Sequence, residues 1–412
     1  MKLKDIADYV TEKISSDAID LDSYITTDSL LQNKAGREKA LNMPPQTCTL
    51  TRYKVGDILV ANIRPYLKKV WMADIDGGCN ADVLVFRAKS NHSANFLYAV
   101  LLQDAFYTYA MKGAKGSKMP RGDKDQIMRY EIPMLSSSEE SIGNFIVDIN
   151  AKIAINREIN RNLEAMARQL YDYWFVQFDF PDENGRPYKS SGGKMVWNEK
   201  LKREIPEGWS SSTIGNIASL NKSSLLKKDD LTELLYLDTS SLTENKIGTL
   251  HYLEREAAPS RAQRKVSKNT ILYSTVRPRL KHFGILCNPP DNLIASTGFC
   301  TIDTNNISYS FWLYLFLTEE KIINNLGDIA DTAVSSYPSI GPSDIEGLQV
   351  CLGNDELMVL FYEKVSALFE IIESNQNENN ELQKQRDELL PLFMNSQVSV
   401  MPSAINCDLS HD

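Results

Sequence analysis

The sequence predicts an α+β protein with two similar units of mixed helix and strand, each followed by a long helix. Two observations support this prediction: a tandem repeat relates the two halves of the chain, and each half ends in a seven-residue apolar pattern. The 412 residues, 42% apolar and 24% charged, are enough for full-sized cores without disulfides or a structural metal.

The repeat is clearest around one motif. Residues 56–69 match residues 269–282 at an offset of 213, and both copies contain Ile-Leu followed by Arg-Pro-x-Leu-Lys. β-Branched runs such as 270–276 predict strands, and the stretches near 94–110 and 308–326 predict helices. Each globular unit is therefore expected to mix the two.

The end of each half predicts a long helix. Apolar residues alternate at spacings of four and three from Ile142 to Trp174 and from Phe361 to Phe393, and an offset of 219 relates the two patterns. Both patterns carry two asparagines at matching positions, as expected if the helices pack against each other. The predicted helix-pairing residues are Asn156, Asn160, Leu163, Leu170, Trp174, Asn375, Asn379, Leu382, Leu389 and Phe393. The alternative is two unrelated amphipathic helices, each packed on its own unit.

These segments predict the order of the domains. Pro and Gly punctuate the stretch between the halves, which indicates a linker. The predicted order is a first unit (1–138), a helix (139–180), a linker (181–205), a second unit (206–352), a second helix (353–396) and a tail (397–412).

Several protein classes are not favoured. The longest apolar run, 311–317, has seven residues, whereas a membrane span needs roughly 20. The segment Met1–Asp5 lacks the apolar region of a signal peptide. Six scattered cysteines and four histidines indicate reduced thiols in a cytoplasm and no metal site. We expect no membrane partner.

The sequence also lacks an obvious catalytic constellation. There is no GxGxxG or GxxxxGK loop, and no cofactor is expected in this chain. Residues 288–291, Asn-Pro-Pro-Asp, depart from the tetrad of adenine methyltransferases at the last position and favour a turn. Pro290-Asp291 with Glu319-Glu320-Lys321 fits only a loose nuclease pattern. A binding protein is favoured; a nuclease or methyltransferase, or a structural coiled-coil scaffold, remain alternatives.

Basic clusters carry the functional signal. The net charge is −9, yet residues 261–281 hold seven bases and no acid. Lys and Arg contact DNA phosphates, and Arg also reads guanine edges. The predicted DNA-binding residues are Arg64, Lys68, Lys69, Lys115, Lys118, Arg121, Lys124, Arg264, Lys265, Arg277, Arg279, Lys281, Ser335, Ser336 and Tyr337. The alternative is solvated surface charge, or, for Arg64 and Arg277, a repeated structural salt bridge.

Three segments resemble one known family. Residues 131–135 (Glu-Ile-Pro-Met-Leu), 162–178 (with Leu-Glu-Ala-Met and Trp-Phe-Val) and 206–209 (Pro-Glu-Gly-Trp) are similar to the specificity subunit of type I restriction-modification systems. The loop at 115–123 also looks like that family. The second half departs more, since Phe393-Met394 replaces Trp174-Phe175 and Val350-Cys351 replaces Ile132-Pro133.

The resemblance implies a DNA reader without catalysis. It implies two target recognition domains, each reading one half of a bipartite, asymmetric site in double-stranded DNA. It implies that the two helices form an antiparallel coiled coil that sets the gap between half-sites. The implied partners are two methyltransferase subunits using S-adenosylmethionine, and restriction subunits using ATP and Mg²⁺ can join them. The implied location is the cytoplasm of a bacterium or archaeon.

Overall fold

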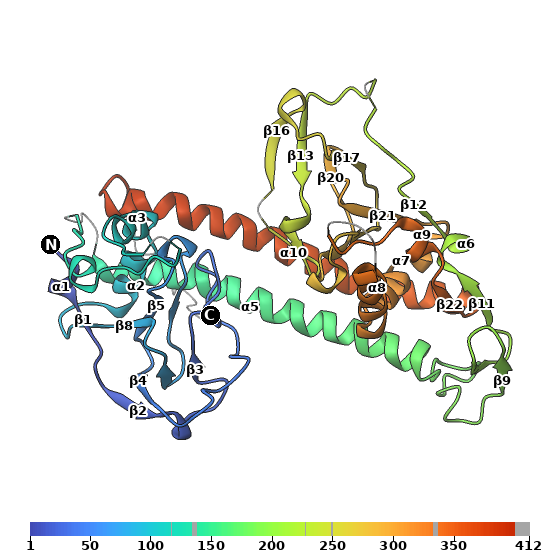
Figure 1. Cartoon of the computed structure of the whole chain (residues 1–412), viewed down its shortest axis with the longest axis horizontal. Coiled ribbons are helices and arrows are strands. Elements are labelled where there is room, and N and C mark those ends of the chain that lie inside the picture. Colours follow the sequence, from blue (N-terminus) through green and yellow to red (C-terminus); the bar gives the residue numbers. More distant parts are fainter. Residues whose placement is uncertain (117, 134–137, 227, 249, 333–336, 400–412) are drawn as a thin grey trace, which may run out of the picture. The chain divides into compact units, whose positions relative to one another are not determined.

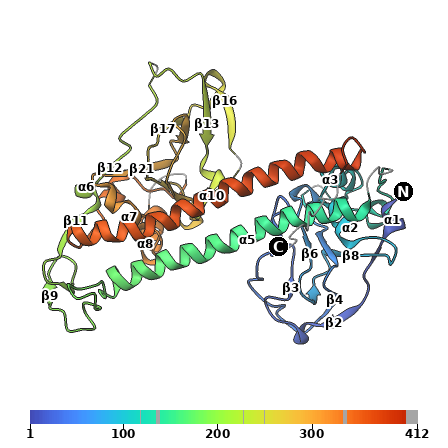
Figure 2. The ribbon, with the colours of Figure 1, turned by 180° about the vertical axis from the view of Figure 1, so that it is seen from behind.

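The computed structural model describes residues 1–116, 118–133, 138–226, 228–248, 250–332 and 337–399. The chain folds into two units: unit 1 is Met1–Ala154 with Glu381–Asp412, and unit 2 is Ile155–Asn380. Each unit contains one segment of both long helices, α5 (Glu139–Tyr171) and α10 (Asp355–Met394). Figures 1 and 2 show α5 in green and α10 in red. The domain boundaries drawn from the sequence stay a prediction.

Unit 1 contains two four-stranded sheets. The order of the first is β1-β8-β5-β6, all antiparallel, and that of the second is β2-β4-β7-β3, with β3 and β7 parallel. The strands are β1 (Ala7–Tyr9), β2 (Lys13–Ser15), β3 (Tyr24–Ile25), β4 (Thr49–Tyr53), β5 (Ile58–Ala61), β6 (Val70–Met72), β7 (Gly77–Cys79) and β8 (Val83–Ala88). The helices before α5 are α1 (Leu3–Ile6), α2 (Ala94–Leu102), α3 (Asp104–Lys112) and α4 (Lys124–Ile127), with 3₁₀ turns η1 (Ser16–Ala18) and η2 (Pro65–Leu67).

Unit 2 also contains two four-stranded sheets, with orders β12-β21-β18-β19 and β16-β13-β20-β17. Their strands are β12 (Ala218–Leu220), β13 (Glu233–Leu237), β16 (His251–Glu254), β17 (Ala262–Lys265), β18 (Thr270–Ser274), β19 (Phe283–Leu286), β20 (Leu293–Ser296) and β21 (Phe299–Thr304). Three strand pairs join β9 (Met195–Asn198) to β10 (Arg203–Pro206), β11 (Ser210–Thr213) to β22 (Gln349–Leu352), and β14 (Leu242–Thr243) to β15 (Lys246–Ile247). The helices are α6 (Ile214–Ile217), α7 (Ser310–Leu317), α8 (Glu320–Thr332) and α9 (Pro342–Glu346), and a π-helical segment, η3 (Asp172–Val176), follows α5. The 3₁₀ turns are η4 (Thr239–Ser241), η5 (Arg255–Ala257), η6 (Pro278–Leu280) and η7 (Ile307–Tyr309).

The strand orders confirm the tandem repeat. Sheet β1-β8-β5-β6 corresponds strand for strand to β12-β21-β18-β19. In the second sheets, β4-β7-β3 corresponds to β17-β20-β13, and in both the last two strands run parallel. The fourth strand differs, because β2 lies beside β4 in unit 1, whereas β16 lies beside β13 in unit 2. The two units therefore share a framework and differ at a sheet edge.

Local sequence explains the main elements. All five residues of β18 are buried, as expected for an apolar run flanked by covered faces. The predicted helix at 94–110 is two helices, because Gln103 has extended backbone angles (φ −65°, ψ 138°). The predicted helix at 308–326 is likewise broken, after Leu317, into the fully buried α7 and the amphipathic α8. The β9–β10 hairpin, which ends at Pro206, lies almost wholly within the predicted linker.

The long helices belong to the cores. In unit 1, Ile146 of α5 and Phe393 of α10 share one buried cluster with the first sheet and α2. In unit 2, Ala167 of α5 and Phe361 of α10 share one with α7, α8 and β18. The predicted packing of the helices on each other is thus confirmed inside each unit. None of the helices in the described ranges is long and apolar enough to cross a membrane.

Phe361 offers a test of this packing. Its side chain is fully buried, and its ring centroid lies 4.9 Å from that of Phe175 and 5.7 Å from that of Trp174. Phe361→Ala is expected to lower the free energy of unfolding by about 3–5 kcal/mol, because it leaves a cavity between α5 and α10. Chemical denaturation measures this loss. Val359→Ala, at an exposed site on the same helix, should change it by about 0.5 kcal/mol or less. Equal losses would contradict the packing.

Candidate nucleic-acid interface

The Arg-Pro-x-Leu-Lys motif forms the same turn in both units. Its arginine and its lysine both have a left-handed backbone conformation, with φ 51° at Arg64 and Lys68, 48° at Arg277 and 57° at Lys281. A 3₁₀ turn with a buried proline lies between them. The arginine N–H donates to a proline carbonyl, Pro120 in unit 1 (2.8 Å) and Pro338 in unit 2 (3.0 Å).

The lysine of the motif forms the repeated ion pair. Lys68 Nζ lies 2.8 Å from a carboxylate oxygen of Asp104, the first residue of α3. Lys281 pairs with Glu320, the first residue of α8. Burial alone would raise the pKa of Asp104, but Lys34 and Lys68 hold it below its usual range. The salt bridge that the sequence suggested for the arginines is thus made by the lysines.

Other predicted bases of unit 2 also have acidic partners. Lys265 Nζ lies 2.9 Å from Asp229. The guanidinium of Arg279 bonds Asp328 and Asp331, both at 2.5 Å. It lies so close to α8 that a Cβ on Gly327 would approach its Cζ to 2.6 Å. Arg279 therefore ties the turn to α8, and its contact with DNA stays a prediction.

Arg264 and the loop before α9 complete the predicted set in unit 2. Arg264 is half-buried, and its Nε has no hydrogen-bond partner in the described structure. The Arg277 guanidinium carbon lies 5.7 Å from the centroid of the Tyr337 ring, so the structure brings these two predicted residues together. Ser335 and Ser336 lie outside the described residues.

In unit 1, two predicted bases are exposed and paired. Arg121 Nε lies 3.1 Å from Asp82, and Lys115 Nζ lies 3.6 Å from Asp123. Both belong to a narrow loop in which Lys115 and Arg121 form a β-bridge. Exposed pairs of this kind contribute little to stability, so these bases are available to a phosphate.

The other predicted bases of unit 1 differ in exposure. Lys69 is half-buried and donates to the Thr27 carbonyl at 2.5 Å; burial lowers its pKa. Lys118 and Lys124 are exposed. Lys69 therefore has a structural partner, whereas Lys118 and Lys124 present charge to solvent.

The asparagines of the long helices pair crosswise in unit 2. Asn156 Nδ2 donates to Asn379 Oδ1 (3.1 Å), and Asn375 Nδ2 donates to Asn160 Oδ1 (2.8 Å). The first asparagine of α5 thus contacts the second asparagine of α10, and the second asparagine of α5 contacts the first of α10. This crossed order is that of an antiparallel pair. Asn156 and Asn379 are buried, and their amides need hydrogen-bond partners there; Asn156 Nδ2 also donates to Glu378 Oε2 at 2.6 Å. The antiparallel pairing implied by the resemblance is confirmed in this unit.

The remaining predicted pairing residues lie along the same seam. Trp174 packs on Phe361 in unit 2, and Phe393 contacts Phe145 at 5.4 Å in unit 1. The leucines Leu163, Leu170, Leu382 and Leu389 are half-buried. Arg386 lies at a position of the same periodic pattern but is not among the predicted pairing residues; it is 2% exposed and donates to Asn150 Oδ1 at 2.7 Å. A single charge at an apolar seam position was the available signal.

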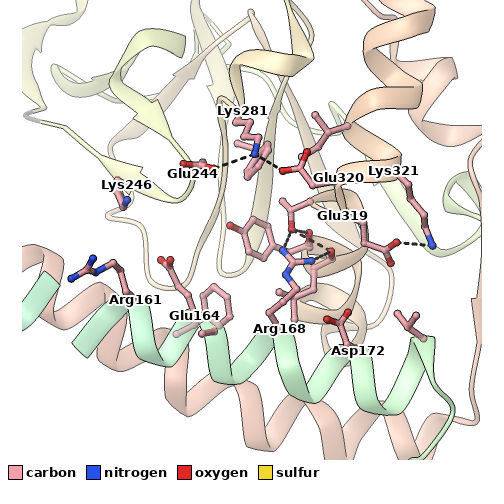
Figure 3. A pocket seen from close by; sticks show the side chains of 18 residues that line it. Arg161, Glu164, Arg168, Asp172, Glu244, Lys246, Lys281, Glu319, Glu320 and Lys321 are labelled. Atoms are coloured by element: carbon pink, nitrogen blue, oxygen red, sulfur yellow. Dashed lines mark hydrogen bonds and ion pairs between the residues drawn. The ribbon is translucent and has the colours of Figure 1, made fainter. Parts of the chain in front are cut away.

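A cleft of about 690 Å³ in unit 2 was not predicted. Figure 3 shows Arg161, Glu164 and Arg168 of α5, and Asp172 at the start of η3, along one wall. Five basic and five acidic residues line it, so its charge favours neither anions nor cations. Arg168 there donates to the Leu315 carbonyl at 2.7 Å and so caps α7.

The cleft bears on the nuclease alternative. Glu319 and Glu320 line it, but Glu319 accepts a hydrogen bond from Tyr171 (2.6 Å) and Glu320 pairs with Lys281. Asp291 is not among the lining residues. In the part of the chain that the structure describes, no group of His, Cys, Asp and Glu side chains could hold a metal.

Comparison with known proteins gives consistent relatives. No protein-family model matches the chain. The chain is 22% identical over 363 residues to the type I restriction enzyme MjaIX specificity subunit of Methanocaldococcus jannaschii, covering 86% of this chain and 80% of that protein. It is 24% identical over 177 residues to the HindI specificity subunit of Haemophilus influenzae, covering 43% and 38%.

A solved structure shows a similar fold. The type I restriction-modification S subunit from M. genitalium matches with a TM-score of 0.57 and 16% identity, over 95% of this chain and 94% of that chain. At this identity the likeness concerns the fold. The comparisons confirm the resemblance seen in the sequence and the predicted fold class.

Proposed function

We propose that this chain is the specificity subunit of a type I restriction-modification enzyme and reads a bipartite DNA site without catalysing a reaction itself. The observation that carries the proposal is the duplicated unit within a chain whose relative, matched over 80% of its length, is a type I specificity subunit. The two units share one framework, and each has one Arg-Pro turn, which fits the reading of two half-sites. The fourth strand of the second sheet differs between the units, which fits an asymmetric site.

The chemistry is assigned to partner subunits. Two methyltransferase subunits would supply S-adenosylmethionine and the methyl transfer, and restriction subunits would supply ATP hydrolysis with Mg²⁺. This chain would hold them on double-stranded DNA, in the cytoplasm where that DNA lies. The paired α5–α10 segments would set the gap between the half-sites.

Methylation of DNA tests the proposal. In cells that express the chain with its methyltransferase subunit, adenine methylation is expected at one bipartite motif, because two separate units read it. Long-read sequencing maps the modified bases. Cells with the methyltransferase alone should lack that motif, and the isolated chain should transfer no labelled methyl group from S-adenosylmethionine.

Two outcomes would support other functions. Methyl transfer or DNA cleavage by the purified chain would indicate an enzyme. A chain that assembles with partners but leaves the methylation pattern unchanged would indicate a structural scaffold.

A further inference from the structure

Arg64 and Arg277 occupy an unfavourable backbone conformation. Their angles are φ 51°, ψ 63° and φ 48°, ψ 66°, in the left-handed region. Gly visits this region without penalty and Asn tolerates it, whereas other residues lose about 1–2 kcal/mol there. An arginine in this position in both copies of the repeat therefore needs a reason that lies in its side chain.

The turn itself does not supply that reason. The hydrogen bonds that hold Arg64 and Arg277 in place use only their backbone N–H and carbonyl groups. The proline of the motif is buried at the start of the 3₁₀ turn, and the lysine anchors the turn to a helix. Unlike the proline and the lysine of the motif, the arginine side chains make no contact that holds the turn in place.

Neither guanidinium has an acidic partner in the part of the chain that the structure describes. Among the described residues, no carboxylate pairs with Arg64 or Arg277, and Arg64 Nε is buried without a hydrogen-bond partner. Arg277 is exposed and lies beside the Tyr337 ring, which limits its side-chain freedom. The other two bases of the same turn, Arg279 and Lys281, are both paired with acids. Among the described residues, Arg277 is therefore the base of this turn that binds an external anion without first giving up an acidic partner.

We infer that Arg64 and Arg277 are equivalent anchors for phosphate groups of the DNA backbone, one in each unit. This rests on the proposed function. The two halves of an asymmetric site differ in base sequence and share only the phosphodiester backbone, so a residue whose main chain is held in the same conformation in both units fits the shared feature. The bases would then be contacted by the segments that differ between the two units. Such segments are the edge strand β2 in unit 1 and the edge strand β16 in unit 2, where Tyr252 is 68% exposed.

The test uses the complex of the full chain with its methyltransferase subunits. Arg277→Asn removes the charge and tolerates the left-handed backbone. The affinity of the complex for DNA is expected to fall roughly tenfold. The fall should be equal for a duplex that contains the bipartite motif found by methylation mapping and for a duplex of scrambled sequence. The slope of log affinity against log salt should become shallower by about 0.9, and by about 1.8 in the double variant with Arg64→Asn. The methylated motif should not change.

Two further variants sharpen the result. Arg277→Lys keeps a charge that a phosphate accepts, so the salt slope should stay at the wild-type value. Lys268→Ala removes an exposed charge at the opposite end of β18 and should leave the slope unchanged. Circular dichroism of each complex checks the fold.

Each outcome decides a different question. A loss confined to the duplex with the motif would make Arg277 a base reader, and an unchanged slope in Arg277→Asn would leave it without a DNA contact; either overturns the inference. Equal slope changes in Arg277→Asn and Lys268→Ala would indicate diffuse attraction and also overturn it. If the wild-type complex failed to distinguish the two duplexes, the proposed function itself would fall.

Discussion

Exchange of residues 206–352 for the corresponding segment of another specificity subunit is expected to change one half of the methylated motif and leave the other half intact. The segment carries both four-stranded sheets of unit 2, including the β16 edge. Its two ends lie side by side, because β11 and β22 pair as antiparallel strands. The exchange therefore keeps the entry and exit points on the helices.

The matched exchange in unit 1 provides the control. There the ends of the segment also meet: Lys2 forms a β-bridge with Glu131, and the Ile132 N–H donates to the Met1 carbonyl at 2.7 Å. Exchange of residues 1–138 should change the other half of the motif. Long-read methylation mapping reads both results. A single exchange that alters both halves, or neither, would refute separate reading by the two units.

Insertion of one heptad into each long helix is expected to widen the gap between half-sites by about three base pairs. Seven residues lengthen a helix by about 10 Å, and base pairs are about 3.4 Å apart. The boundaries of the units, after Ala154 in α5 and after Asn380 in α10, are the places to insert. Copies of residues 148–154 and 381–387 preserve the seven-residue register and duplicate the bond between Arg386 and Asn150.

The half-site sequences should stay the same, because both insertions leave the sheets untouched. Binding should weaken, since the added base pairs also rotate one half-site relative to the other. Insertion into α5 alone is the control: it puts the two ends of the seam one heptad out of register, so the Asn150–Arg386 and Asn156–Asn379 bonds cannot both form, and sequence-specific methylation should be abolished. Methylation at the original gap by the double insertion would show that the helices do not set the spacing.

The sequence alone determined the features that depend on local periodicity. The repeat at offset 213 indicated two copies of one unit, and the strand orders agree. The spacing of four and three located both long helices, because such spacing puts the apolar residues on one helical face. The matched asparagines predicted polar contacts between the helices, and the amides of Asn156 and Asn379 meet in unit 2.

Only the tertiary structure decided which bases are neutralised. Arg277, Arg279 and Lys281 look alike in sequence, yet the acids that pair with two of them lie 39 to 52 residues away on α8. Whether a lysine meets a carboxylate depends on which helix folds against its turn, and local propensity does not encode that. The left-handed conformation of Arg64 and Arg277 was hidden for the same reason: it occurs together with backbone hydrogen bonds to Pro120 and Pro338, which are remote in the chain.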